Sequence, residues 1–182
     1  MRIEKETITI RSARIADAVQ LNNWWNDGAV MQHAGFPNGI GQTLNGTIQA
    51  IQNWQDIIGQ LCLIEIDDRP IGELSYRINS DGVAYTGWKI CEVNYQNQGY
   101  GPQIIRLLFN YLFTDPTIKN SWPIKRVQWD TLLENKRAQY VYETKLKARK
   151  IGIRENVWQD QLGNWRSSVD YAITREEFLV LE

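Results

Sequence analysis

The sequence predicts an α+β fold built on one mixed, mainly antiparallel central sheet with helices on both faces. Strand-like runs joined by short turns fill much of the first half of the chain, and a strand–helix–strand order follows from residue 83 onward. Runs of strands combined with such units are typical of a sheet that carries helices on its faces. The length of 182 residues, with 43% hydrophobic and 23% charged residues, fits a single domain over residues 1–182.

The first half of the chain is expected to supply most of the antiparallel strands. A strand is predicted at residues 6–13, because Ile8 and Ile10 alternate with polar residues, as on a half-buried strand. The elements that follow are a helix at 15–26, a Gly-rich loop at 34–41, a helix at 44–55, and strands at 61–66, 71–79 and 83–92. Turn-forming residues at 67–70 and 79–82 join these strands as hairpins.

The second half is expected to begin with a helix at residues 100–113, whose apolar residues recur at helical spacing. The remaining elements are a strand at 124–129, a helix that starts at Asn135, and strands at 150–158 and 165–173 joined by the polar loop 159–164. The order strand, helix, strand, helix, strand places a crossover unit beside the antiparallel part of the sheet.

A short Gly-rich segment between the strand at 83–92 and the helix at 100–113 is predicted to bind a phosphate group. Its residues are Gln96, Asn97, Gln98, Gly99, Tyr100 and Gly101. Glycines allow close backbone approach and conformations that a Cβ would forbid. The first N–H groups of the following helix have no intrahelical partner, and the helix dipole favours an anion there. A pyrophosphate is therefore the expected ligand.

A second signal lies about 40 residues downstream, where Asn135 is predicted to cap an amphipathic helix. Ala138, Val141 and Tyr142 follow Asn135 at helical spacing. Asn135 and Tyr142 are seven residues apart, so both side chains can lie on one face of that helix, two turns from each other.

Taken together, the pattern Gln-x-x-Gly-x-Gly followed by Asn-x-x-Ala-x-x-x-Tyr-Glu resembles the paired cofactor motifs of the GCN5-related N-acetyltransferase (GNAT) family. The resemblance covers nearly the whole chain. It is closest to the branch that contains ribosomal-protein N-terminal and aminoglycoside 6'-N-acetyltransferases, through residues 8–14, 24–27, 108–119 and 163–178. Two positions depart from the family pattern. Leu146 and Lys147 stand near the place of a Gly-Phe pair, and Thr86 stands where the family often has Glu.

The resemblance implies the GNAT acyl-CoA N-acyltransferase fold and the transfer of an acetyl group from acetyl-CoA to a primary amine by direct attack. By this resemblance, residues 96–101 would hold the pyrophosphate of coenzyme A, as the matching segment does in that family. The strand end around Cys91 would pair its backbone with the pantetheine arm. Asn135 would hydrogen-bond that arm, and Tyr142 would donate a proton to the leaving sulfur.

The proton acceptor is open at this point, because Thr86 cannot act as a base. Glu92 and Glu73 are the two carboxylate candidates, and both fall in predicted strands. Strict alternation would put Glu92 on the same strand face as Trp88, whose ring would then desolvate the site. Glu92 is therefore favoured slightly over Glu73.

Composition argues against several other classes of function. A net charge of −1 gives no electrostatic signal for nucleic acid. No run of 18 apolar residues and no signal-peptide pattern are present, so a cytoplasmic location without a membrane partner is expected. Cys62, Cys91 and the single histidine, His33, make neither a disulfide framework nor a metal site, and His33 is expected at the surface or at the edge of a pocket.

Three hypotheses remain for the acceptor side. The first is a small-molecule amine such as an aminoglycoside, with Trp24, Trp25 and the loop 34–41 as the walls of a compact pocket. The second is a protein N-terminus, as in the acetylation of ribosomal proteins. The third is a non-catalytic acyl-CoA-binding module that has kept only the phosphate site. A homodimer is a further expectation from the family resemblance.

Overall fold

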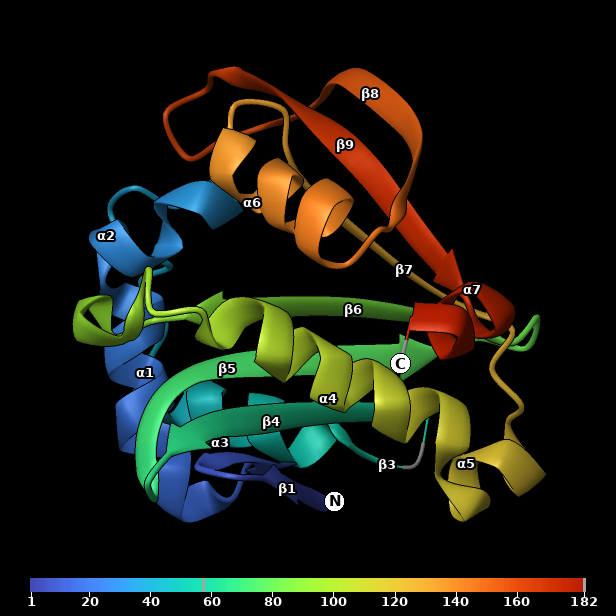
Figure 1. The fold of residues 1–182 in the computed structure, drawn as a ribbon. Coiled ribbons are helices and arrows are strands. Elements are labelled where there is room, and N and C mark those ends of the chain that lie inside the picture. Colours follow the sequence, from blue (N-terminus) through green and yellow to red (C-terminus); the bar gives the residue numbers. More distant parts are fainter. Residues whose placement is uncertain (57, 182) are drawn as a thin grey trace.

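The computed structural model describes residues 1–56 and 58–181, and a nine-stranded mixed sheet forms its centre (Figure 1). The strands are β1 (Arg2–Lys5), β2 (Ile8–Ser12), β3 (Gln55–Asp56), β4 (Gly59–Ile66), β5 (Arg69–Ile78), β6 (Val83–Ile90), β7 (Arg126–Leu132), β8 (Arg149–Gln159) and β9 (Trp165–Thr174). They lie in the order β1-β2-β4-β5-β6-β7-β9-β8, and β3 pairs with β4. Every pair is antiparallel except β6–β7. The predicted α+β fold class is confirmed.

Helices cover both faces of the sheet, as predicted. One face carries α1 (Ala18–Asn26) and α3 (Leu44–Asn53), and the other carries α4 (Tyr100–Thr114) (Figure 1). The shorter helical segments are η1 (Ile15–Asp17), α2 (Gly28–Met31), η2 (Gln32–Ala34), η3 (Val93–Tyr95), α5 (Pro116–Ser121), α6 (Lys136–Tyr140), the π-helical turn η4 (Val141–Lys145) and α7 (Arg175–Leu181). None of the helices in the described residues is long and apolar enough to span a membrane.

The centre of the sheet is buried on both faces, which explains the nearly continuous apolar sequence of β4. Leu61 and Leu63 pack on the side of α1 and α3, whereas Cys62 and Ile64 pack on the side of α4. All four side chains are less than a tenth exposed. A strand covered on both faces loses the apolar–polar alternation that marks a half-exposed strand.

The sheet splits between β6 and β7, and this split positions the functional site. Only Val83–Tyr85 of β6 pairs with Arg126–Gln128 of β7. The two strands then diverge, and the opening is visible between their ribbons in Figure 1. The edge of β6 from Thr86 onward therefore has no partner strand on this side among the described residues.

Several short elements were not predicted, because they have too few residues for a hydrophobic period to show. They are β1, β3, α2, α5 and α7. Capping chemistry stabilises two of them. The Asp27 carboxylate accepts a hydrogen bond from the N–H of Ala29 at the start of α2, and the Asp115 carboxylate accepts from Thr117 and Ile118 at the start of α5.

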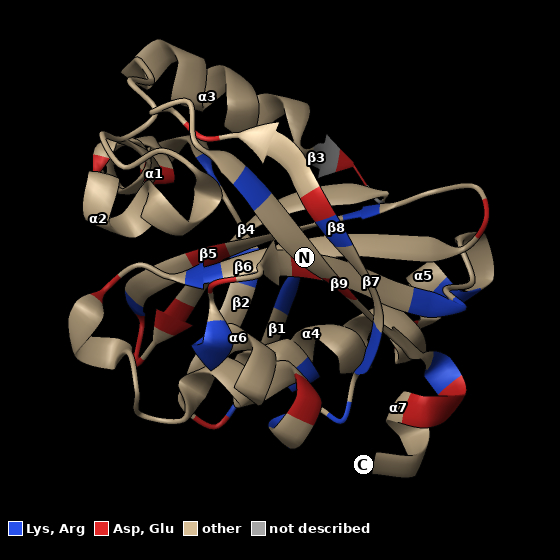
Figure 2. Ribbon diagram, turned by 90° about the horizontal axis from the view of Figure 1, so that it is seen from above, with Lys and Arg blue, Asp and Glu red and all other residues tan. Residues whose placement is uncertain are grey.

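Basic and acidic residues are interspersed along the ribbon in the view of Figure 2, on helices and strands alike. Several of them neutralise one another directly. Arg11 binds Asp17 and Glu65 at 2.7 and 2.8 Å, and Arg154 binds Asp130 and Asp170 at 3.0 and 2.7 Å.

Candidate active site

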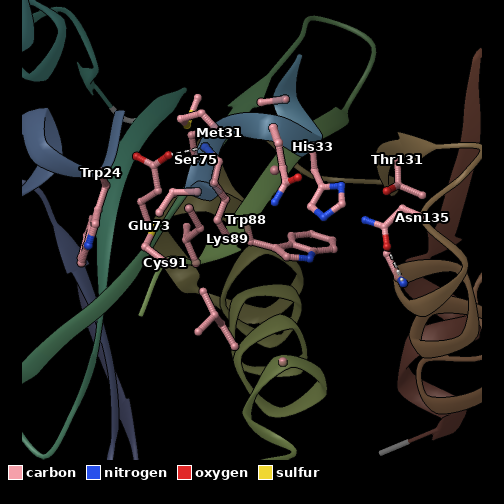
Figure 3. A pocket seen from close by; sticks show the side chains of 18 of the residues that line it. Trp24, Met31, His33, Glu73, Ser75, Trp88, Lys89, Cys91, Thr131 and Asn135 are labelled. Atoms are coloured by element: carbon pink, nitrogen blue, oxygen red, sulfur yellow. Dashed lines mark hydrogen bonds and ion pairs between the residues drawn. The ribbon is translucent and has the colours of Figure 1, made fainter. Parts of the chain in front are cut away.

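A cavity of about 1120 Å³ occupies the split between β6 and β7. Its walls come from α1, the α2–η2 segment, β5, β6, β7 and the α6 region, so both halves of the chain contribute. Figure 3 shows the side chains that point into it, among them His33, Glu73, Trp88 and Asn135. The phosphate-binding segment predicted from the sequence opens into the same space through Gln96 and Gly101.

The segment 96–101 has the backbone geometry of an anion site. Asn97 and Gly99 have φ of 62° and 84°, in the left-handed region, and Gly99 precedes the first residue of α4. A Cβ added to Gly99 or Gly101 would meet no atom within 4 Å, so the space above both residues is open. The unpaired N–H groups at the start of this 15-residue helix face that space with the positive end of its dipole.

The glutamine side chains of this segment fold back onto the protein. The Gln96 amide donates to the carbonyl of Ile90 at 2.9 Å and ties the segment to the end of β6. The Gln98 amide donates to the carbonyl of Asn94. Tyr100 lies against Tyr95, with ring centroids 6.2 Å apart. A ligand here would therefore meet backbone N–H groups first, as the sequence suggested for a pyrophosphate.

Cys91 is buried at the end of β6, and its backbone N–H already donates to the carbonyl of Ile71 at 2.8 Å. This N–H is not available to a cofactor arm, which departs from the sequence expectation. The unpaired edge of β6, from Thr86 to Ile90, offers the open backbone groups instead. Burial also raises the pKa of the Cys91 thiol, so this side chain stays protonated.

Asn135 and Tyr142 both line the cavity. Asn135 caps α6 as predicted, because its Oδ1 accepts from the N–H of Ala138 at 3.1 Å. The capping bond uses the amide oxygen and leaves the amide NH₂ to donate to a ligand. Tyr142 lies in the π-helical turn that continues α6. A single π turn inside a helix often marks a functional position.

The Tyr142 ring is 7% exposed and lies in an aromatic cluster. It makes edge contacts with Trp88, Trp129 and Tyr171, at centroid distances of 5.7, 5.6 and 5.2 Å. Burial raises the pKa of the Tyr142 phenol, and a hydrogen bond with Trp88 opposes this in part. Because the phenol keeps its proton at neutral pH, Tyr142 is suited to donate a hydrogen bond or a proton.

The paired tryptophans of α1 orient the two candidate carboxylates. Trp24 Nε1 donates to Glu92 at 2.8 Å, and Trp25 Nε1 donates to Glu73 at 2.8 Å. Both indoles line the cavity, as the sequence predicted for the acceptor side. Their polar edges hold the acidic groups in place, and their rings form the wall.

The two carboxylates differ in their remaining partners. Glu73 is 7% exposed and forms a 2.6 Å ion pair with Lys89, which lies directly opposite on β6 (Figure 3). Glu92 has the Trp24 indole but no cationic partner among residues 1–56 and 58–181. Glu92 therefore carries the less compensated negative charge at this wall.

The alternation expected through Glu92 is wrong. β6 ends at Ile90, and the N–H groups of both Cys91 and Glu92 donate to the carbonyl of Ile71, at 2.8 and 3.0 Å. When two consecutive N–H groups donate to one carbonyl, the strand has a bulge, and its side chains no longer alternate between the two faces of the sheet. Glu92 consequently turns toward Trp24, and Trp88 packs in the aromatic cluster with Tyr142.

Some functional positions gave no signal in the sequence. Thr86 lines the cavity, but its hydroxyl donates to the carbonyl of Ser75 at 2.8 Å, so it acts as a wall. Lys89 and Trp158 also line the cavity. Their roles depend on strand register and on the β8–β9 hairpin, which no local motif encodes. His33 is exposed and lines the cavity, as predicted for a pocket-edge residue.

A sheet split at one parallel pair, with a glycine-rich turn and a helix N-terminus at the split, defines the class of acyl-coenzyme A N-acyltransferases. The model of the acetyltransferase (GNAT) domain family matches residues 7–145, and the chain belongs to this family. It is an acetyl-CoA-dependent N-acetyltransferase. No curated protein sequence matches the chain.

Solved structures share the fold at low sequence identity. One is RimL, a ribosomal L7/L12 alpha-N-protein acetyltransferase in complex with coenzyme A, with a TM-score of 0.80, 18% identity, and coverage of 96% of this chain and 98% of that one. Another is spermidine N-acetyltransferase from Vibrio cholerae in complex with CoA and spermine, with a TM-score of 0.82, 17% identity, and coverage of 96% and 99%. The microcin C7 self-immunity acetyltransferase MccE, in complex with acetyl-CoA and AMP, matches with a TM-score of 0.75, 16% identity and coverage of 93% of both chains.

The residues present fit acetyl-CoA. The open space above Gly99 and Gly101 would receive the pyrophosphate on backbone N–H groups. The unpaired edge of β6 and the Asn135 amide would hydrogen-bond the amide-bearing arm. When bound, the cofactor would supply the acetyl thioester, and Tyr142 lies in the wall of the same cavity.

Proposed function

We propose that this enzyme acetylates a primary amine on a small molecule, such as an aminoglycoside. The observation that carries the proposal is a roof over the acceptor side of the cavity. This roof consists of the β8–β9 hairpin and the loop after η2, joined through Gln161. The Gln161 N–H donates to Gly35 O at 2.8 Å, its side chain donates to Gly39 O at 2.9 Å, and its Oε1 accepts from Asn38 N–H at 2.9 Å.

Close packing completes the roof. A Cβ added to Gly35 would lie 2.3 Å from the Trp158 ring, so the hairpin and the loop are in direct contact. The cavity beneath holds about 1120 Å³, slightly above the range of about 300–1,000 Å³ that is usual for one small molecule. The pantetheine arm and a compact amine would share this space, whereas a protein N-terminus needs an open groove for the residues that follow it.

The charge of the wall favours a cationic acceptor. Asp27, Glu73, Glu92 and Asp130 line the cavity, together with Lys89 and Arg137. Lys89 neutralises Glu73, and Arg154 neutralises Asp130. Glu92, oriented by the Trp24 N–H, is then well placed to receive an ammonium group.

The protein side chains have separate roles in the proposed reaction. Glu92 draws the ammonium group into the cavity and orients it. Glu73 is paired with Lys89 and Trp25 and has a structural role, because it fixes the positions of these two side chains in the cavity wall. From the sequence it was a second candidate for the base. Tyr142 donates to the sulfur as negative charge develops there.

Glu92→Gln is expected to lower the rate at pH 7 and to have much less effect at pH 9 and above. The amide keeps the size of the side chain but not the charge that attracts an ammonium group. An alkyl amine has a pKa of about 10.4, so more neutral amine is present at the higher pH. Steady-state kinetics between pH 6 and 10 would measure the effect, which should appear mainly in KM for the amine.

Glu73→Gln is the matched comparison, because it removes the same charge from a carboxylate that is already ion-paired. Glu73→Gln should lower the free energy of unfolding, because Lys89 would lose its ion-pair partner. A Glu92→Gln enzyme with wild-type kinetics over the whole range would show that Glu92 only holds Trp24. A fall in kcat without a change in KM would assign Glu92 the proton itself, as first inferred from the sequence.

The acceptor class is tested by measuring thiol release from acetyl-CoA with a panel of amines. Aminoglycosides, polyamines and short peptides with free N-termini would be compared by kcat/KM. Small cationic amines should be the better substrates by at least about tenfold, the equivalent of 1.4 kcal/mol. Peptides acetylated faster than every small amine would overturn the proposal in favour of a protein N-terminal acetyltransferase.

Protein N-terminal acetylation is the second candidate, because the ribosomal-protein acetyltransferase RimL is among the structural neighbours. A non-catalytic acyl-CoA-binding module is not proposed, because the family is one of acetyltransferases and Tyr142 lines the cavity.

We also propose that residues 1–182 act as one domain in the cytoplasm. The strands beyond the residues matched to the family continue its sheet, because β9 pairs with β7 along seven residues, Arg126–Leu132. A homodimer is proposed as well. β8 is the outer strand of the sheet, with Ile151 and Ile153 about half exposed. Light scattering would measure the mass in solution, and a monomer at micromolar concentration would contradict the dimer.

A further inference from the structure

We propose that His33 is the base that accepts the proton of the acceptor ammonium group. His33 is the only histidine of the chain and lies in the short helical turn η2. Its imidazole points into the cavity in Figure 3, and Trp88 and Asn135 line the same cavity. Neither ring nitrogen has a hydrogen-bond partner in the described part of the chain, so both are available to a ligand.

The other candidates are less suited to take the proton. Glu73 is held by Lys89 at 2.6 Å and by Trp25 at 2.8 Å. Glu92 accepts a hydrogen bond from Trp24 at 2.8 Å. The His33 imidazole has no such bond to give up, and histidine is the side chain that most often serves as a general base.

The turn that carries His33 is anchored at several points. Gly35 has φ of 91° and ends the turn, with its N–H bonded to Gln32 O at 3.1 Å, and the Phe36 N–H donates to Met31 O at 3.1 Å. The Gly35 carbonyl then accepts from Gln161 of the hairpin, and Trp158 packs against Gly35. A general base must be held within hydrogen-bond reach of its proton, and these contacts fix the backbone for that purpose.

Several charged side chains line the cavity into which His33 points, and some of them form ion pairs with one another. They are Asp27 at the start of α2, the pair Glu73–Lys89 on β5 and β6, Glu92 after β6, Asp130 of β7 with Arg154 of β8, and Arg137 of α6. Asp27 and Glu92 are the two carboxylates of this set without a cationic partner in the described residues, and Glu92 lies beside Trp24 after β6. It would hold the ammonium group, while His33 removes a proton from it.

This inference rests on the proposed amine acceptor, and its step balances as follows. The ammonium nitrogen gives one proton to a ring nitrogen of His33. The neutral amine forms the C–N bond to the acetyl carbon as the C–S bond breaks. The sulfur takes a proton from Tyr142, and the second proton that the nitrogen loses returns to Tyr142. His33 releases its proton to solvent, so the net products are the acetamide, the free thiol and one proton.

His33→Gln tests the proposal, with kcat measured against pH at a saturating concentration of whichever amine the panel identifies as best. The wild-type kcat should fall on the acidic side of its pH profile, because a protonated imidazole cannot accept a proton. The variant should be slower at pH 7 by about 10²-fold and should lack that acidic limb. In His33→Ala, added imidazole should restore part of the rate. Lys119→Gln, at an exposed position of α5 outside the cavity, should keep the wild-type profile.

The single histidine also permits a test that does not depend on turnover. Its C2–H signal in the proton NMR spectrum should shift on addition of coenzyme A together with the acceptor amine, while thermal unfolding and acetyl-CoA affinity of His33→Gln stay unchanged. A wild-type pH profile in His33→Gln, or an equal loss in Lys119→Gln, would overturn the assignment. If the best acceptor is a peptide, the proposed acceptor class fails, and the test of His33 still stands.

Discussion

Gly101→Val is expected to weaken acetyl-CoA binding by about 30- to 150-fold, which corresponds to the loss of one or two charge-assisted hydrogen bonds worth about 2–3 kcal/mol in total. A Cβ at residue 101 meets no protein atom within 4 Å, so the valine fits the free protein. Its branched side chain would occupy the space that a pyrophosphate needs above the start of α4. Isothermal titration calorimetry with acetyl-CoA would measure the change.

Gln103→Val is the matched control, because it puts the same β-branched residue at an exposed position in the first turns of α4. It carries the same small cost in helix propensity and blocks no backbone N–H at the start of the helix. Gly99→Val is a less clean test, since φ of 84° would strain a valine. Unchanged affinity in Gly101→Val would mean that the phosphate site lies elsewhere.

The cofactor side could be predicted from the sequence because its signals are local. The conformation of Gly99, the start of α4 and the Asn135 cap all arise from neighbouring residues, and each was recognised from its residue types. Most strands were predicted for the same reason, because alternation and turn residues act over a few positions. The buried strand β4 lacked alternation but was marked by its apolar run.

The acceptor side could not be predicted in the same way, because its geometry depends on distant contacts. Glu73 is neutralised by Lys89 through strand register, 16 residues apart in sequence. Glu92 turns toward Trp24 because a bulge ends β6, and no residue pattern marks that bulge. The roof depends on Gln161, more than 120 residues from the glycines that it contacts.

Tyr142→Phe is expected to lower kcat by about 10²-fold, within the usual range for the loss of a general acid. The substitution keeps the ring and its contacts with Trp88 and Trp129 and removes only the hydroxyl. Because burial raises the pKa of this phenol, the wild-type enzyme should show no alkaline loss of activity from Tyr142 ionisation up to about pH 10, the ordinary pKa of a phenol. Acetyl-CoA affinity should change little.

Tyr171→Phe separates this catalytic effect from damage to the aromatic cluster. Tyr171 is fully buried, contacts the Tyr142 ring at 5.2 Å, and donates its hydroxyl to Glu143 at 2.6 Å. Removing that hydroxyl should lower stability by about 0.5–1.5 kcal/mol, because the exposed Glu143 carboxylate keeps water and Lys150 as partners, while kcat stays near the wild-type value. A single-turnover assay with the folded fraction measured in parallel would compare the two variants. If both lose turnover equally, the cluster and not the Tyr142 hydroxyl sets the rate. If neither loses it, the sulfur leaves without a proton from Tyr142.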